Sequence, residues 1–223
     1  METAMRYLRD NGLTIALCSA FLVTLAGMLG AGWLTQNQEL ARHGAPAIDL
    51  VSYFLSPDFQ STLFENWESE FLQMSAYVIM TAMLFQRGSS ESKDPDSDSP
   101  EDADPRKERH KKDAPWPVKA GGLWLTLYSY SLGIALSLLF VLSFTMHWLQ
   151  SAAAANQEAA LHGEPTQSAM SYLADPQLWF ESFQNWQSEF LSTAVLVVFS
   201  IVLRYRGSPE SKPVAAPHAS TGH

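Results

Sequence analysis

A nine-residue pattern, F-x-N-W-x-S-E-F-L, occurs twice in the chain, at Phe64–Leu72 and again at Phe183–Leu191. Its two asparagines, Asn66 and Asn185, are 119 residues apart. The same offset relates two further pairs of segments: His43–Pro46 with His162–Pro165, and Arg87–Lys93 with Arg206–Lys212. One offset shared by three separate segments predicts a tandem duplication. We therefore expect a fold built from two similar halves.

Two long segments of the chain carry no charge. Leu13–Trp33 is uncharged over 21 residues and Leu123–Trp148 over 26, with His147 its one group that titrates near neutral pH. Each exceeds the roughly 20 apolar residues that cross a bilayer core. Two shorter apolar runs become long enough when extended back to the motif tryptophans, because tryptophan is enriched at the membrane interface. We predict four spans, over about 13–33, 67–86, 123–148 and 186–204.

The distribution of basic residues predicts how these spans are oriented. Of the 14 Lys and Arg residues, only Arg42 lies in either of the two loops that join paired spans. The positive-inside rule then places both termini and the central linker in the cytoplasm. The predicted fold class is an all-α membrane protein of four transmembrane helices, arranged as two tandem parallel helical hairpins. A pseudo-twofold axis along the membrane normal would relate them.

The domain boundaries follow from this duplication. Residues 1–93 form the first two-helix repeat, 123–212 the second, and 213–223 a flexible tail. Between the repeats, residues 94–122 are first acidic and then basic, with few apolar side chains, which predicts a disordered cytoplasmic linker. The basic half, Arg106–Lys112, would contact anionic lipid at the inner leaflet, or else serve only as a solvated tether.

The duplicated motif supplies the strongest candidate site. At helical spacing its polar residues share one face, and this predicts an intramembrane polar site made of Asn66, Trp67, Glu70, Gln73, Asn185, Trp186, Glu189 and Ser192. An acid within a membrane is a functional hypothesis by default. The alternative is a hydrogen-bonded clamp that holds the hairpins together. Glu65 and Glu68, which are glutamines in the second copy, are expected on a solvated face.

A weaker candidate is a metal site outside the spans. Glu39 and His43 are four residues apart, as are Glu158 and His162, so each pair shares a helix face. The ordinary alternative is a histidine that interacts with the helix C-terminus and the preceding glutamate. G-x-S-x-G, HExxH, phosphate-loop and CxxC motifs do not occur, so we expect neither a familiar enzyme nor a cofactor. With a net charge of −9, the chain is not expected to bind nucleic acid.

Taken with the R-G-S-x-E-S-K sequence after each second span, the doubled motif resembles an uncharacterised family of small bacterial multi-pass membrane proteins, classed as a domain of unknown function. The resemblance implies the bacterial inner membrane and carries no activity. Two functions remain open. One is cation or proton transport or conductance through the paired acids. The other is a non-transporting structural or stress-associated role, through association with a partner or as a homo-oligomer in the lipid bilayer.

Overall fold

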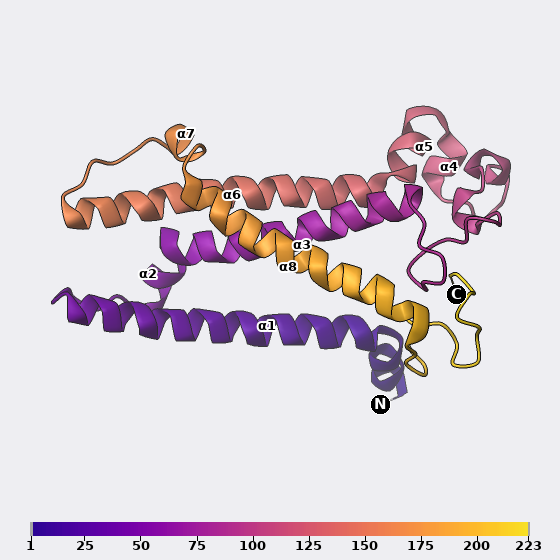
Figure 1. Ribbon diagram of the computed structural model, residues 1–223, viewed down its shortest axis with the longest axis horizontal. Coiled ribbons are helices and arrows are strands. Elements are labelled where there is room, and N and C mark those ends of the chain that lie inside the picture. The colour runs from indigo at the N-terminus through magenta and orange to yellow at the C-terminus, as the bar shows by residue number, and fades with distance from the viewer. Residues whose placement is uncertain (1, 223) are drawn as a thin grey trace. The chain divides into compact units, whose positions relative to one another are not determined.

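The computed structural model describes residues 2–222, and within them every regular element is a helix. The chain forms two compact units, Met1–Leu63 with Leu149–Gln167, and Phe64–Trp148 with Ser168–His223. Each unit therefore takes residues from both predicted repeats. In chain order the elements are α1 (Glu2–Arg42), α2 (Leu50–Phe54), α3 (Pro57–Met83), η1 (Pro100–Asp102), η2 (Pro105–Glu108), α4 (Trp116–Ala120), α5 (Gly122–Ser129), α6 (Ser131–His162), α7 (Ala169–Tyr172) and α8 (Pro176–Val202) (Figure 1).

Three of these helices are long and apolar enough to cross a membrane. They are Met5–Arg42 of α1, the whole of α6 and the whole of α8, which fits a membrane location. The predicted span 67–86 lies on α3, which ends at Met83 and is not among the three. Three glutamates in its first half lower the mean hydropathy of α3, so its status as a fourth span is a proposal taken up below.

The predicted span 123–148 is not one continuous helix. It is interrupted at Tyr130, between α5 and α6. On either side, Ser129 donates its hydroxyl to the Leu125 carbonyl (2.8 Å) and Ser131 donates to the Tyr128 carbonyl (2.8 Å). Such serine bonds to backbone carbonyls compete with the helix ladder and often bend it. Hydropathy alone does not reveal this break, because a hydropathy value does not depend on the hydrogen bonds that a serine hydroxyl makes.

In the first unit, α1 is held to the short helix α2. Trp33 donates its indole N–H to the Ile48 carbonyl at 2.7 Å, and Asn37 both donates to that carbonyl and accepts from the Ile48 amide. Tyr53 of α2 is buried and meets the Phe59 ring edge-on, with 5.4 Å between centroids. These contacts order the connection between α1 and α3 and fix the start of α3.

The loops after α1 and α6 are built alike. Asn156 pairs with the backbone of Gln167 in the same two-bond manner as Asn37 with Ile48, and each pair of equivalent residues is 119 apart. Both helices end at a glycine with positive φ, Gly44 (+68°) and Gly163 (+71°). A glycine in this left-handed conformation terminates a helix, as the Gly-x-Pro pattern at 44–46 predicts.

In the second unit, α3 contacts both α6 and α8 through polar side chains. Ser75 of α3 and Ser137 of α6 share a hydrogen bond of 2.7 Å between their hydroxyls. Gln73 of α3 donates to the Thr193 hydroxyl of α8 at 2.6 Å. Interhelical bonds of this kind support packing in lipid, where apolar burial contributes little.

The two R-G-S-x-E-S-K segments form matching turns after α3 and α8. In each, a serine hydroxyl accepts from the backbone amide six residues earlier, Ser92 from Gln86 (2.8 Å) and Ser211 from Tyr205 (2.9 Å). The segments also contact each other, since the Ser90 hydroxyl donates to the Glu210 carbonyl at 3.1 Å. Lys212, the last residue of the second predicted repeat, is buried, and its ammonium donates to the Ser220 carbonyl of the segment predicted as a flexible tail, at 2.8 Å.

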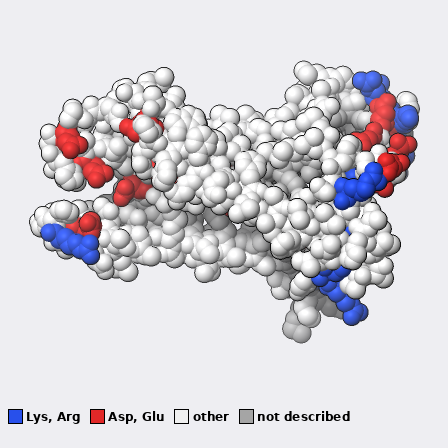
Figure 2. Space-filling view, in the orientation of Figure 1, with Lys and Arg blue, Asp and Glu red and all other residues white. Residues whose placement is uncertain are grey.

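The segment predicted to be a disordered linker contains η1, η2 and α4. The charged residues of this segment pair with residues close to them in the chain: Asp96 with Arg87 (2.6 Å), Asp102 with Lys93 (2.7 Å), and Lys111 with Glu108. Figure 2 shows positive and negative side chains gathered over this part of the chain. Of the basic residues at 106–112, Lys111 therefore already has an acidic partner.

Candidate functional site

The second unit buries an imidazole between carboxylates from two other helices. His147 of α6 and Glu68 of α3 are each 0% exposed, and 2.9 Å separates His147 Nδ1 from Glu68 Oε2. On the other side of the ring, His147 Nε2 lies 3.4 Å from Glu181 Oε2 of α8. One histidine thus joins three helices of this unit. Burying such groups is costly unless they are paired and hydrogen-bonded.

Glu68 is satisfied almost entirely by groups on α6 and α8. Beyond its bond with His147, its Oε1 accepts from the Ser182 hydroxyl at 2.8 Å and from the Trp186 indole N–H at 3.1 Å. Hydrogen bonds to an ionised acceptor are about twice as strong as neutral ones. A carboxylate with three such partners is held in a single orientation.

Glu65 completes the group from one turn earlier on α3. It is half-buried, and its Oε1 accepts from the Asn185 side-chain amide at 2.6 Å. Glu181 is similarly held, because its Oε1 accepts from the Gln177 side-chain amide at 2.7 Å. One ligand atom each of Glu65, His147 and Glu181 lies within 4.8 Å of the other two. We call Glu65, Glu68, His147 and Glu181 the Glu–His cluster.

Aromatic rings on α6 and α8 surround this cluster. Trp186 meets the rings of Phe140 and Trp179 edge-on, at centroid distances of 6.1 and 6.5 Å. Phe183 meets Trp186 at 5.4 Å, and Trp179 donates its indole N–H to the Leu173 carbonyl. Of these rings, Trp186 contacts the cluster directly, through its indole N–H bond to Glu68. Glu65 and Glu181 are half-buried, the latter with 26% of its side chain exposed.

The start of α8 places Glu181 correctly. Asp175 caps the helix by accepting from the Gln177 amide at 2.9 Å, and Pro176 occupies its first turn. Gln177 and Glu181 then share a helix face at a spacing of four residues. The N-cap residue Asp175 therefore helps to position Gln177, whose side-chain amide bonds Glu181 of the cluster.

Chemically, the cluster contains groups that can bind a cation. Three carboxyl groups, those of Glu65, Glu68 and Glu181, lie close to one imidazole. Imidazole is the side chain that titrates nearest to neutral pH, and both carboxylate and imidazole bind metals. The cluster can therefore accept a proton or a metal ion.

Two of the eight predicted polar-site residues contact the cluster. Asn185 bonds Glu65, and Trp186 bonds Glu68. The remaining six are also on α3 and α8. Asn66 is exposed, Trp67 is half-buried against Phe64, and Gln73 bonds Thr193. Ser192 is exposed and donates to the Glu189 backbone carbonyl.

The two predicted acids, Glu70 and Glu189, form a separate pair. Glu70 is exposed and Glu189 half-buried, and their charges act on each other. The two residues therefore lie near each other, whereas the ring nitrogens of His147 contact Glu68 and Glu181.

The weaker metal candidates form local contacts within their own helices. Glu39 pairs with Arg42 at 2.8 Å and lies 3.9 Å from the His43 ring. His162 contacts the backbone carbonyl of Glu158, not its carboxylate, at 2.9 Å. These four residues thus follow the ordinary pattern of a helix C-terminus.

Sequence reasoning missed the centre of the site. The expectation that Glu68 is solvated is wrong, because it is fully buried. Two signals pointed to the site: His147 is the only titratable group near neutral pH in its long apolar run, and Glu65 and Glu68 are glutamines in the other repeat. Acids present in one copy alone indicate a site that occurs once in the duplicated framework.

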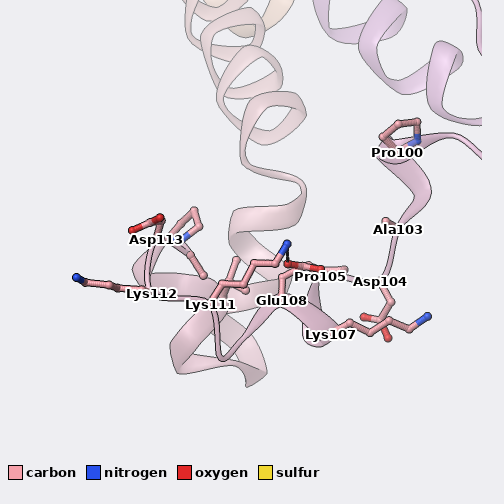
Figure 3. A pocket seen from close by; sticks show the side chains of 12 residues that line it. Pro100, Ala103, Asp104, Pro105, Lys107, Glu108, Lys111, Lys112 and Asp113 are labelled. Atoms are coloured by element: carbon pink, nitrogen blue, oxygen red, sulfur yellow. Dashed lines mark ion pairs between the residues drawn. The ribbon is translucent and has the colours of Figure 1, made fainter.

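A separate hollow lies outside this site. It has a volume of about 650 Å³ and is lined by the 100–118 segment, including Pro100, Lys107 and Asp113 (Figure 3). Its lining mixes lysine, acidic and proline side chains, and Figure 3 shows the Lys111–Glu108 pair at its wall. None of its lining residues belongs to the Glu–His cluster.

Comparison with known proteins gives a family and no activity. No curated protein and no solved structure matches the chain. A family model described as a domain of unknown function, DUF6766, matches residues 4–223. Because this match covers nearly the whole chain, the protein belongs to the DUF6766 family.

Proposed function

We propose that this protein is a four-span membrane protein of the bacterial inner membrane in which the Glu–His cluster binds a cation, the proton above all, for transport or conductance. The observation that carries the proposal is the fully buried imidazole of His147 between Glu68 and Glu181, on three different helices. Ionisable groups inside membrane helices mark ion pathways and proton relays. In this proposal α3 supplies the fourth span.

The duplicated architecture supports the four-span arrangement. Residues 119 apart form the same bonds in several places: Asn37 and Asn156 in the loops, and Ser92 and Ser211 in the turns. If both halves are the same two-helix unit, α3 occupies in the first half the place of α8 in the second. Both termini and the linker would then lie in the cytoplasm, with the hairpins parallel.

A proton flux assay tests the transport proposal. Purified full-length protein is reconstituted in vesicles containing a pH-sensitive dye, and a potential is applied across the bilayer. We expect flux in the native protein and its loss in Glu68→Gln and His147→Gln, because the first removes a charge and the second the titrating ring. Glu164→Gln, an exposed loop acid, is the matched control and should retain flux.

A second pair of variants distinguishes the two candidate sites. Glu70→Gln and Glu189→Gln alter the predicted acid pair and leave the His147 contacts in place. Flux lost in these variants and kept in Glu68→Gln would assign transport to the acid pair. Flux absent from the native protein at every pH from 5 to 8 would rule out transport by either site.

A structural role is the second candidate, and one observation favours it. Glu68 is bonded to His147, Ser182 and Trp186, as expected for a polar clamp between helices. A clamp requires no change in protonation. In that case Glu68→Gln would lower the thermal stability of the protein, and vesicles that contain the native protein would carry no proton flux. The protein would then act by association with itself or a partner, with the basic part of the linker at anionic lipid.

A further inference from the structure

We infer that Glu65, His147 and Glu181 form a binding site for a divalent first-row transition metal of the Zn²⁺ type, with Glu68 orienting the imidazole. The inference rests on the proposed function, since it names the metal that the same cation site would take. It begins from the three donor atoms that lie within 4.8 Å of one another.

The donor set selects this class of metal. One imidazole nitrogen with two carboxylate oxygens suits Zn²⁺, Mn²⁺ and Co²⁺. Mg²⁺ and Ca²⁺ favour sets made only of oxygen, and Cu(I) favours sulfur. Cys18, the single cysteine, lies on α1 and is not part of the group.

The distances fit a tetrahedral metal. Bonds of about 2.1 Å to nitrogen and oxygen place neighbouring ligand atoms about 3.4 Å apart. His147 Nε2 and Glu181 Oε2 are 3.4 Å apart. A Glu65 carboxylate oxygen lies within 4.8 Å of both, and the inferred site requires it to move closer when the metal binds. Three protein ligands leave a fourth position for water or substrate, as in catalytic and transport sites.

Each of the three ligands is oriented by a further residue. Glu68 holds the Nδ1 side of His147, Gln177 holds Glu181, and Asn185 holds Glu65. A carboxylate that accepts Nδ1–H leaves Nε2 facing the metal and makes it a stronger ligand. Such outer partners accompany metal-binding histidines in known sites. A solvated acidic cluster would not require a hydrogen-bond partner for each of its members.

Metal binding would exchange a proton for the ion. If the imidazole is protonated, its Nε2–H proton leaves to solvent as the Nε2 lone pair binds the metal, while the Nδ1–H stays on the ring and donates to Glu68. Carboxylate oxygens of Glu65 and Glu181 bind without covalent change, and no electron is transferred. Because the proton competes with the metal, the affinity should fall as the pH is lowered, by up to about tenfold per pH unit where the imidazole is protonated.

The test is metal titration of the full-length chain in detergent. A Cys18→Ser background is stripped with chelator and titrated with Zn²⁺ by calorimetry, and with Co²⁺ by visible absorption, which reports tetrahedral coordination. We expect one tight site per chain and no comparable Mg²⁺ site. Glu65→Gln and Glu181→Gln should each weaken Zn²⁺ by tenfold or more. Glu68→Gln should weaken it about 10- to 100-fold through the histidine.

Controls separate a lost site from a lost fold. Glu164→Gln should bind as the parent does, and circular dichroism should show the same helix content in every variant. Zn²⁺ should raise the thermal midpoint of the parent, but not that of Glu65→Gln. A parent that binds no Zn²⁺, or Zn²⁺ that stays bound in both Glu65→Gln and Glu181→Gln, would overturn the inference. Proton flux without Zn²⁺ binding would leave transport standing, and binding without flux would remove transport alone.

Discussion

At the scale of single residues, Glu68 accepts hydrogen bonds from three side chains on two other helices. Glu68→Ala should lower the free energy of unfolding by on the order of 3 kcal/mol, because it leaves buried donors and an imidazole without their acceptor. Thermal unfolding in detergent measures this change. Glu68→Gln should cost less, since its carbonyl oxygen can still accept.

Glu70→Ala is the control for this prediction. Glu70 is two residues along the same helix and exposed, so its removal should change stability by no more than about 0.5 kcal/mol. Equal losses from Glu68→Ala and Glu70→Ala would contradict the assigned burial. They would favour instead the clamp that the polar stripe predicts around Glu70.

The difference between Glu68 and Glu70 shows why the sequence could not identify the site. At about 100° per residue, the two side chains point about 200° apart around α3. The repeated motif indicates which residues both halves keep, and Glu70 is among them. Which side of α3 faces α6 and α8 depends on tertiary packing, for example on Ser75 with Ser137 and Gln73 with Thr193. No spacing along the chain encodes that rotation.

At the scale of elements, Gly32 lets α2 approach α1 closely. A Cβ at Gly32 would overlap the Tyr53 hydroxyl oxygen and lie 3.0 Å from the ring carbon Cζ. Gly32→Ala should therefore destabilise the protein by about 1 to 3 kcal/mol, less the small gain in helix propensity. The measurement is the thermal midpoint in detergent.

Gly30→Ala, on the same helix, is the control, because a Cβ there meets nothing within 4 Å. It should leave the midpoint unchanged or raise it. Tyr53→Phe removes the overlapping oxygen, so the double variant Gly32→Ala/Tyr53→Phe should recover part of the loss. A Gly32→Ala protein as stable as Gly30→Ala would show that α2 does not rest on α1.

Helix ends were more predictable than helix interiors. The cap residues Ser56 and Asp175 and the stop at Gly44 were readable, because capping depends on side chains within a few residues. The break at Tyr130 was not, because the run around it is uniformly apolar. The composition of the linker predicts disorder, but the structure contains the short helices η1 and η2 there. Both begin at a proline, and η2 is capped by Asp104, which are local features that composition does not describe.

At the scale of the whole molecule, the two halves share a framework and differ in chemistry. Positions of the cluster correspond across the offset to neutral residues: Glu65 to Gln184, Glu68 to Gln187, His147 to Met28, and Glu181 to Thr62. The loop and turn bonds, in contrast, recur in both halves. This division supports a duplicated framework in which a single copy of the cluster carries the function.

The final prediction tests how the chain crosses the membrane. With Cys18→Ser removing the only native thiol, single cysteines are placed at Ser52, Ser171 and Ser97, which are all exposed. The positive-inside rule puts the first two outside and the linker inside. A membrane-impermeant maleimide should therefore label Ser52→Cys and Ser171→Cys in intact cells, and Ser97→Cys only after permeabilisation.

The labelling pattern also decides the status of α3. Ser52 precedes α3 and Ser97 follows it, so opposite accessibility of these two positions requires an odd number of crossings between them, as a spanning α3 supplies. If α3 lies on one side of the membrane, both positions should react alike. In that case the Glu–His cluster, which takes two carboxylates from α3, would lie outside the bilayer and could not serve as a step in transport across it.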